Sequence, residues 1–325
     1  MNKIKLGMVG GGKGSFIGEV HRMAARLDDR YELIAGALSA DAKTAEESAL
    51  SLNLDKSRSY SSYETMAEVE STLESGIDVV AIVTPNHLHA KIAELFLSKG
   101  IHVICDKPLT TNLNDAEHLA SIVKKSGLIF TVTYNYSGYP MVRQAREMIQ
   151  NNDLGELRAV QIEYAQDWLA TGIESTGHKQ ALWRTNPEKA GIGGAIGDIG
   201  THAFHLSEFV TGLRVRTLLA DLDSFVAGRE LDDNASILME YTNGAKGMLW
   251  VSQIAAGKEN GLKIRVYGSN AGLEWAQENP NFLKFSPLGE SPRTLSRGGP
   301  SIGSLAGDAT RIPSGHPEGF IEGFA

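Results

Sequence analysis

The stretch IKLGMVGGGKGSFIGEVHRMAARL, residues 4–27, decides the fold of the first half of this chain. The run Ile4–Val9 is short and apolar, as in a buried strand; the glycine cluster Gly10–Gly14 ends it, and amphipathic residues follow from Phe16 to Leu27. This order suits a dinucleotide, because N–H groups and the helix dipole favour a pyrophosphate at the helix start. The expected cofactor contacts here are Gly10, Gly12, Gly14, Ser15, Phe16 and Ile17.

The glycine fingerprint of such sites, G-x-G-x-x-G, is not met strictly. Gly10 and Gly12 are followed by Ser15 where the third glycine should stand. Gly18 supplies that glycine only if the loop is three residues longer. A glycine cluster beside a strand is also typical of an ordinary flexible loop, so that alternative stays open at this point.

Strands continue to alternate with helices beyond this stretch. The predicted strands are Tyr31–Leu38, Asp78–Val83, His102–Cys105 and Leu128–Val132. The predicted helices between them are Lys43–Leu52, His89–Lys99 and Asn114–Ser126. Because right-handed crossovers join such strands into a parallel sheet, the sequence predicts an α/β fold in which residues 1–137 form a doubly wound Rossmann domain that binds NAD(P).

The pattern changes after about Pro140. One helix, Met141–Asn151, leads into long strand-like runs at Leu157–Asp167, Arg216–Phe225, Asn234–Tyr241, Ala245–Ala255, Lys263–Tyr267 and Gly272–Trp275. Asn243-Gly244 is a strong hairpin signal between two of these runs, because both residues tolerate positive φ. Residues 138–325 are therefore predicted to form an α+β domain with an open, largely antiparallel sheet, with Trp183–His205 inserted between strands.

Two short motifs contain the side chains best suited to chemistry. In HVICDKP, His102–Pro108, a Val/Ile strand should end at the carboxyl edge of the sheet and leave Lys107 beside the crevice. Asp198 and His202 are four residues apart and share one face if their segment is helical. An ammonium, a carboxylate and an imidazole in one pocket can move a proton off an alcohol.

Each of these residues also has an ordinary structural explanation, as a solvated loop lysine or as a structural pair on a helix. His87 and His89 have poor spacing for a metal on a helix, and no carboxylate accompanies them, so no metal site is expected. Cys105 is the single cysteine and cannot form an internal disulfide.

Taken together, the motifs resemble the glucose-fructose oxidoreductase / inositol dehydrogenase / rhizopine catabolism (Gfo/Idh/MocA) oxidoreductases. The matching elements are the glycine loop with His21 after Gly18, the segment Thr84-Pro85-Asn86-His87-x-His89, Asp106-Lys107-Pro108, and Gly193-Gly194-x-x-x-Asp198-x-Gly200-x-His202. The departures are Asp106 in place of the usual Glu, the longer glycine loop, and an end at Ala325 where relatives usually continue into further helices.

The resemblance implies NAD(P)-linked oxidation or reduction of a sugar, glycoside or polyol. It also implies that the Lys107–Pro108 bond is cis, and that the chain assembles into a homodimer or homotetramer through its C-terminal sheet. The further cofactor contacts expected from it are Thr84, Pro85, Asn86, His89, Asp106 and Lys107.

Roles for the reacting groups follow from the chemistry of alcohol oxidation. A neutral imidazole is a suitable base at neutral pH, so His202 is expected to take the hydroxyl proton. Asp198 orients that imidazole or binds a neighbouring hydroxyl, and Lys107 holds the oxygen and can share the proton relay. The expected substrate contacts are Lys107, Tyr136, Trp183, Arg184, Asp198, His202 and His316.

The choice between NAD and NADP depends on the end of the second strand. A carboxylate there selects NAD, but the residue at that tip is Ser39. Ser39 with Lys43 could accept a phosphate, whereas Asp41 is close enough to bind a ribose hydroxyl. The sequence leaves this preference undecided.

Composition limits the surroundings of the protein. A net charge of −8 with no cluster of Lys and Arg disfavours nucleic acid and anionic membranes as partners. The absence of a signal peptide or long apolar run, together with a single cysteine, favours the cytoplasm. A dehydrogenase is the preferred hypothesis. The alternatives are a hydrolase or eliminase that keeps its NAD bound, and a cofactor-binding regulator without turnover.

Overall fold

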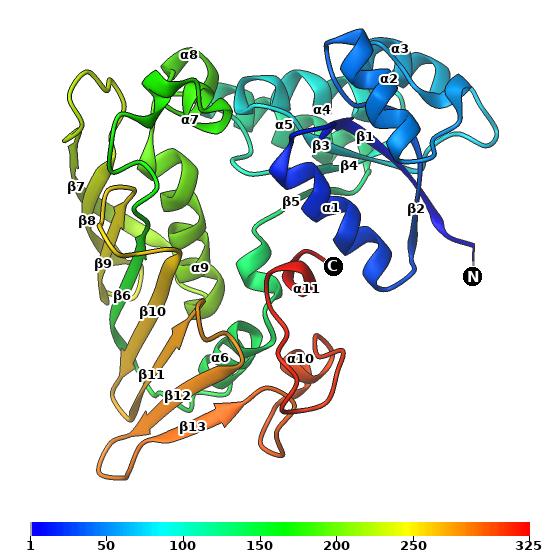
Figure 1. Ribbon diagram of the computed structural model, residues 1–325. Helices are drawn as coiled ribbons and strands as arrows, with labels where there is room; N and C mark the ends of the chain where they lie inside the picture. The colour runs from blue at the N-terminus through cyan, green and yellow to red at the C-terminus, as the bar shows by residue number, and fades with distance from the viewer. Residues whose placement is uncertain (1) are drawn as a thin grey trace. The chain divides into compact units, whose positions relative to one another are not determined.

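The computed structural model describes residues 2–325, which form two compact units (Figure 1). The first unit runs to Thr133 and also includes Phe324 and Ala325, and the second is Tyr134–Gly323. The division thus comes slightly before the predicted boundary at residue 137. Each unit has a sheet of its own.

The first unit contains a five-stranded parallel sheet of order β2-β1-β3-β4-β5. Its strands are β1 (Ile4–Gly10), β2 (Tyr31–Ala37), β3 (Val79–Val83), β4 (His102–Cys105) and β5 (Phe130–Val132). Its helices are α1 (Phe16–Leu27), α2 (Ala42–Ser51), η1 (Lys56–Arg58), α3 (Tyr63–Glu70), η2 (Asn86–Leu88), α4 (His89–Ser98) and α5 (Leu113–Ser126). The strand order reverses between β1 and β3, the point at which doubly wound sheets bind ligands.

The predicted Rossmann fold is confirmed, and every predicted strand and helix of this half is present within one or two residues. Helix α3 was not predicted. Its inward face includes Glu70, which is 2 % exposed and pairs with the Arg58 guanidinium, while the Tyr60 hydroxyl donates to it at 2.6 Å. A charged residue on the buried face breaks the apolar period by which a helix is found in sequence.

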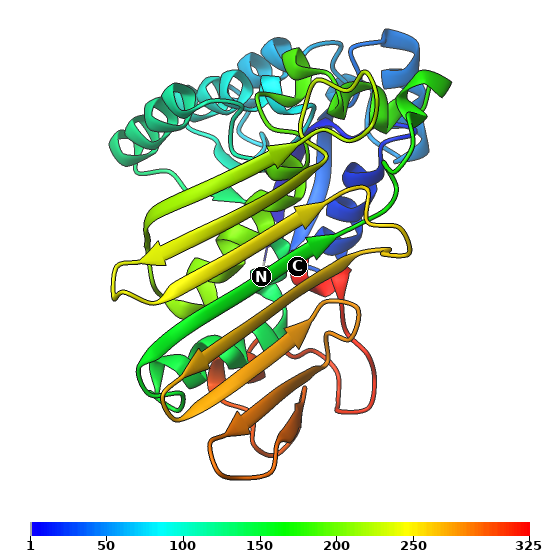
Figure 2. The same ribbon diagram turned by 90° about the vertical axis from the view of Figure 1, so that its left-hand side faces the viewer.

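The second unit contains an eight-stranded sheet of order β13-β12-β11-β10-β6-β9-β8-β7 (Figure 2). Its strands are β6 (Leu157–Ala165), β7 (Val215–Asp223), β8 (Asn234–Tyr241), β9 (Lys246–Ser252), β10 (Gly261–Gly268), β11 (Ala271–Ala276), β12 (Phe282–Pro287) and β13 (Arg293–Ser296). Only β6 and β9 pair in parallel, so the predicted open, largely antiparallel sheet is confirmed.

The other elements of this unit are helical. They are η3 (Asn135–Gly138), α6 (Pro140–Gln150), η4 (Ile173–Thr176), α7 (Lys179–Arg184), α8 (Pro187–Ala190), η5 (Ile196–Gly200), α9 (Thr201–Thr211), α10 (Ser304–Gly307) and α11 (Phe320–Phe324). The helices α6 and α9 lie against one face of the sheet, where Leu206 and Ile264 belong to a single core (Figure 1). The other face lacks a helical cover, as Figure 2 shows.

The strands β12 and β13 were not predicted. β13 is the edge of the sheet, and its sequence RTLS has no apolar alternation. The predicted hairpin between β8 and β9 is present, with Gly244 at φ +89° in its turn. Asn243 does not adopt positive φ, so only the glycine uses the left-handed region that the sequence allowed to both residues.

Candidate active site

The loop between β1 and α1 is a close-packed glycine cradle. Gly10, Gly11 and Gly14 have φ of +79°, +73° and +79°, a region open mainly to glycine. A Cβ added to Gly18 would lie 2.3 Å from the Gly11 Cα, so Gly18 takes the place of the third glycine. The loop is therefore the longer form that the sequence left open, and its backbone leaves room for a ligand to approach closely.

The same cradle is tied to the end of β2. Gly12 N–H donates to the Leu38 carbonyl at 3.0 Å, and Lys13 N–H donates to the Ser48 hydroxyl of α2 at 2.9 Å. Ser15 precedes α1 in an extended conformation, and its side chain makes no capping bond to the helix. A helix start directly after a glycine loop fits the pyrophosphate of a dinucleotide.

The β2–α2 corner holds both groups that bear on the choice of cofactor. The Asp41 carboxylate caps α2 by accepting from Thr44 N–H at 2.8 Å and from the Thr44 hydroxyl at 2.6 Å, and these bonds lower the pKa of Asp41. Ser39 accepts from Asp41 N–H at 3.1 Å, and Lys43 is exposed in the first turn. A carboxylate and an ammonium are thus both present, so the geometry of this corner favours neither NAD nor NADP.

Two loops at the carboxyl ends of β3 and β4 are joined by His89. Its side chain is buried, with Nδ1 2.8 Å from the Pro108 carbonyl and Nε2 3.0 Å from the Thr84 carbonyl. Burial lowers the pKa of His89. The buried ring thus holds the two loops together, and the predicted contact of His89 with the cofactor stays a prediction.

The loop after β4 contains the predicted Lys107, and the Lys107–Pro108 bond is cis, as the family resemblance implied. Asp106, just before it, is buried and accepts from the Thr133 hydroxyl at 2.8 Å. His21 Nε2 lies 3.6 Å from the Asp106 carboxylate, too far for a hydrogen bond but close enough for an ion pair. Burial raises the pKa of Asp106, but His21, Lys107 and Thr133 together outweigh it, and the pKa falls to about 2.

In the second unit, Asp198 lies in a single π-helical turn, Ile196–Gly200, that runs directly into α9. The turn is held from the segment before β8: the Asp232 carboxylate accepts from Gly194 N–H at 2.6 Å and from Ile196 N–H at 2.7 Å. Burial raises the pKa of Asp232, although these N–H bonds oppose the shift. The predicted regular helix is therefore a π turn at this point, a feature frequent at functional sites.

The Asp198 carboxylate lies among polar side chains. Arg184 Nε is 3.3 Å from it, and Gln253 Nε2 donates to it at 2.8 Å. The Arg184 guanidinium lies 4.2 Å from the centre of the Trp183 ring and 5.9 Å from that of Trp168. The structure thus brings the predicted Trp183, Arg184 and Asp198 together.

His202, in the first turn of α9, is 7 % exposed and is surrounded by aromatic rings. The rings of Tyr136, Tyr134 and Tyr164 meet it edge-on, with centres 4.9, 5.7 and 6.3 Å away. His316 lies on an exposed loop, and its backbone carbonyl accepts a hydrogen bond from the Arg297 guanidinium. A substrate contact by His316 stays a prediction.

Sequence reasoning missed Asp232, Gln253, Tyr164 and Asn260, which hold or surround the predicted residues. The one available signal was the pair Asp232-Asp233 directly before a strand, where carboxylates are unusual unless they bond to backbone. Within residues 2–325, no cluster of three or more His, Cys, Asp or Glu side chains is arranged to hold a metal ion. No helix in that range is both long and apolar enough to cross a membrane.

Comparison with known proteins agrees with both units. Residues 4–134 match the oxidoreductase family with an NAD-binding Rossmann fold, and residues 142–274 match the GFO/IDH/MocA C-terminal domain. The chain belongs to the GFO/IDH/MocA oxidoreductase family. It is therefore an oxidoreductase with an NAD-binding Rossmann domain, as the sequence predicted.

Solved structures of similar proteins include two close matches. An oxidoreductase from Sinorhizobium meliloti is 54 % identical, with a TM-score of 0.91 over 100 % of this chain and 86 % of that one. An inositol dehydrogenase homolog from Azotobacter vinelandii complexed with NAD⁺ is 40 % identical, with a TM-score of 0.96 over 99 % of this chain and 83 % of that one. The Azotobacter protein has also been solved with NADH and myo-inositol.

A relative with a known activity is more distant. The levoglucosan dehydrogenase of Pseudarthrobacter phenanthrenivorans is 27 % identical over 88 % of this chain and 77 % of its own length. Dehydrogenases of polyols and anhydrosugars therefore share the two-domain arrangement of this chain.

The glycine cradle yields a first prediction. NAD⁺ at saturating concentration should raise the melting temperature of the wild-type protein by about 5 °C, because it binds only the folded state. Gly18→Ala should abolish most of that rise, since its Cβ would displace the Gly11 backbone. The control Gly307→Ala adds a Cβ that meets no atom within 4 Å and should keep the rise. A full rise in Gly18→Ala, or none in the wild type with NAD⁺ or NADP⁺, would contradict the assignment of the cradle.

Asp106 yields a second prediction, measured by urea unfolding. Removing this buried and hydrogen-bonded carboxylate with Asp106→Asn should lower the free energy of unfolding by about 2–3 kcal/mol at pH 7. In the folded protein the pKa of Asp106 is about 2, which is below the value of ~3.9 expected in the unfolded chain. The carboxylate therefore stabilises the fold fully above pH ~3.9, and this stabilisation is lost as the pH falls toward 2. The difference between the two proteins should therefore shrink from pH 5 to pH 3. A difference that stays constant would show that this carboxylate is not ionised in the folded protein.

Proposed function

We propose that this protein oxidises a secondary hydroxyl group of a cyclic polyol or sugar with NAD⁺, and catalyses the reverse reduction. The observation that supports it best is the second-unit site, in which Asp198 forms a polar cluster with Arg184 and Gln253, four residues before the enclosed imidazole of His202 on one helical segment. Hydroxyl-rich substrates suit this site because charged donors and acceptors bind hydroxyl groups beside an aromatic surface.

Each protein group has a defined part in the proposed reaction. His202 takes the hydroxyl proton while the alcohol carbon gives up its hydride, so the carbon becomes a carbonyl and the imidazole becomes positively charged. Lys107 holds the reacting oxygen by a charge-assisted hydrogen bond. The bound dinucleotide supplies the acceptor of the hydride.

Asp198 is better suited to binding than to proton transfer. Its carboxylate already faces the Arg184 guanidinium and accepts a hydrogen bond from the Gln253 amide. We therefore propose that Asp198 and Arg184 bind hydroxyl groups next to the reacting one, and that Trp183 contributes its ring face. The relative solved with NADH and myo-inositol supports a cyclic polyol as the first substrate class to test.

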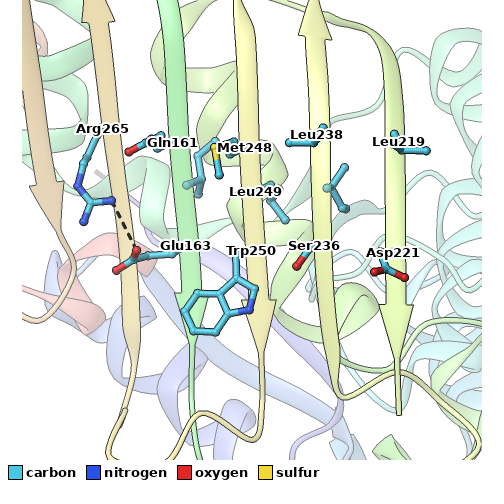
Figure 3. Close-up of a pocket in the computed structure, with 12 residues that line it drawn as sticks. Gln161, Glu163, Leu219, Asp221, Ser236, Leu238, Met248, Leu249, Trp250 and Arg265 are labelled. Atoms are coloured by element: carbon cyan, nitrogen blue, oxygen red, sulfur yellow. Dashed lines mark hydrogen bonds and ion pairs between the residues drawn. The ribbon is translucent and has the colours of Figure 1, made fainter. Parts of the chain in front are cut away.

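We also propose that the open face of the eight-stranded sheet joins two copies of this chain. The face is defined here by the exposed side chains Leu219, Leu238, Met248 and Trp250, which project from neighbouring strands (Figure 3). Exposed fractions of 69, 54, 54 and 37 % are high for such large apolar groups. A continuous apolar patch of this kind is typical of an interface between subunits.

The charges at the ends of this row support a second copy as the partner. Arg265, 3.5 Å from Glu163, lies at one end, and Asp221 lies at the other (Figure 3). A two-fold axis near Trp250 would bring Arg265 of each copy toward Asp221 of the other, which is the self-complementarity of a symmetric dimer. A cytoplasmic location remains part of the proposal, supported by the single buried Cys105.

The proposed base and oxygen-holding group are tested by turnover. His202→Ala and Lys107→Ala should each lower the rate of polyol oxidation by about a hundredfold or more, because both act on the transition state. The melting-temperature rise with NAD⁺ should stay close to that of the wild type. His118→Ala, which removes an exposed imidazole paired with Glu94, serves as the control.

The pH dependence separates the two groups. In the wild type, oxidation should accelerate as the pH rises and the base loses its proton, and this step should be lost in His202→Ala. Retention of both the activity and the pH step in His202→Ala would assign the base to another residue, with Lys107 the first to examine.

The proposed dimer is tested by light scattering coupled to size-exclusion chromatography. The wild-type chain should elute with at least twice the mass of one chain. Leu238→Lys combined with Met248→Lys should dissociate it, because two buried ammonium groups would face each other across the interface. Leu50→Lys changes a leucine that is 72 % exposed on α2 and should leave the mass unchanged. A wild-type mass equal to one chain would refute the proposed interface.

A further inference from the structure

A chain of hydrogen bonds links two of the tyrosines that surround His202 to three further polar side chains. All of these residues belong to the second unit. Trp168 Nε1 donates to Gln166 Oε1 at 3.1 Å, and Gln166 Nε2 donates to Asn260 Oδ1 at 2.8 Å. Asn260 Nδ2 donates to the Tyr136 hydroxyl at 3.3 Å, and the Tyr164 hydroxyl donates to Asn260 Oδ1 at 2.7 Å. The hydroxyl oxygens of Tyr136 and Tyr164 are 2.6 Å apart. These side chains come from η3, from the end of β6 and from the residue before β10.

The direction of every bond in this chain is fixed by the indole of Trp168. An indole N–H can only donate, so the Gln166 oxygen must face it and the Gln166 amide nitrogen must face Asn260. The Asn260 oxygen therefore faces Gln166, and the Asn260 amide nitrogen faces Tyr136. Because the Tyr164 proton is used on Asn260, the bond between the two hydroxyl groups must be donated by Tyr136.

The result is a closed cycle in which Tyr136 donates to Tyr164, Tyr164 donates to Asn260, and Asn260 donates back to Tyr136. Bonds that all point the same way around a cycle polarise and strengthen one another. Burial raises the pKa of both phenols, so both stay protonated at neutral pH and the cycle stays closed. Without Asn260, the buried Tyr164 hydroxyl would lose its acceptor and the Tyr136 hydroxyl would lose its donor, so the cycle would open.

The cycle fixes the rings that contact His202. Tyr136 and Tyr164 are both 3 % exposed, and each ring meets the imidazole edge-on. Tyr136 was predicted to contact the substrate, which stays a prediction; its hydroxyl donates to Tyr164 and accepts from Asn260 within the cycle. Tyr136 therefore contacts the imidazole with its ring and turns its hydroxyl toward Asn260.

We propose that Asn260 is a positioning residue for His202, acting through the cycle with Tyr136 and Tyr164. Its amide holds two phenol rings that fix the plane of the imidazole, so that the ring nitrogen is aimed at the alcohol before the substrate binds. This inference rests on the proposed function in one respect, because the effect on turnover assumes that His202 is the base.

The test compares two buried tyrosines that both contact α9. Tyr164 contacts His202, and Tyr241 bonds to Ser207. Tyr164→Phe opens the cycle by removing one hydroxyl group. Tyr241→Phe removes an equally buried hydroxyl group that bonds to Ser207, also on α9, at 2.8 Å. Both changes delete one buried hydroxyl oxygen, but Tyr164→Phe breaks two hydrogen bonds and Tyr241→Phe breaks one, so Tyr164→Phe should lower the melting temperature more. Only Tyr164 contacts His202.

Two readouts are measured in the full-length protein. The first is the NMR signal of the His202 ring protons in protein labelled with ¹³C-histidine, assigned as the signal that His202→Ala removes. The second is the rate of polyol oxidation at saturating NAD⁺. Tyr164→Phe should move the His202 signal and lower the rate about tenfold, whereas Tyr241→Phe should do neither.

The possible results separate the inference from the function on which it rests. An unmoved His202 signal in Tyr164→Phe, or an equal loss of rate in both variants, would overturn the positioning role. A moved signal with an unchanged rate would confirm that the cycle positions the imidazole and would overturn His202 as the base.

Combining two substitutions in one protein gives a check that does not depend on how much activity each single substitution removes. Asn260→Ala and Tyr164→Phe break the same cycle of hydrogen bonds. The double variant should therefore lose little more activity than Asn260→Ala alone. Asn260→Ala combined with Tyr241→Phe should lower the melting temperature by the sum of the two single effects, because Tyr241 lies outside the cycle. Additive losses in the first pair would mean that Asn260 and Tyr164 act independently, which contradicts the inference.

Discussion

The Asp232 carboxylate is the interaction on which the arrangement of the second-unit site depends. It accepts from the N–H groups of Gly194 and Ile196, while its own carbonyl accepts from Ala195. These are N–H groups that a helix start leaves without intrahelical partners. A Cβ added to Gly194 would lie 2.1 Å from the Asp232 carbonyl oxygen, so a glycine is required where the two segments meet. Close backbone packing thus explains the glycine at position 194.

Once the start of this helical segment is fixed, the chemistry of its side chains follows from what surrounds each. Asp198 faces a guanidinium and an amide donor. His202 is enclosed by phenol rings, which exclude water. The same short segment therefore presents a group suited to binding hydroxyls and a group suited to accepting a proton. Separate environments for neighbouring titratable groups are how proteins assign acid and base roles.

The sequence predicts those features that depend on local pattern. The strand, glycine loop and helix at residues 4–27 are local, and so is the placement of Lys107 after a buried strand. The residues that hold the site could not be found in this way. Asp232, Gln253 and Asn260 are single polar residues on segments far from Asp198 and His202 in sequence, and their partners become evident only when the sheet is formed.

A local sequence pattern also does not show which groups a side chain contacts in the folded protein. His89 follows a strand in a motif shared with the family, which suggested a ligand contact, yet both its ring nitrogens face backbone carbonyls. The π turn at Ile196–Gly200 could not be predicted either, because its wider backbone results from the Asp232 bonds and not from any periodicity of its own residues.

The central claim is that this protein transfers a hydride from an alcohol carbon to NAD⁺, and isotope transfer tests it most directly. The protein is mixed with NAD⁺ and myo-inositol deuterated at carbon, with scyllo-inositol and levoglucosan as further substrates, and the NADH is analysed by mass spectrometry and NMR. The account predicts NADH with one deuterium at C4 of the nicotinamide and a ketone product in equal amount. A converted substrate without deuterium in the dinucleotide would contradict it.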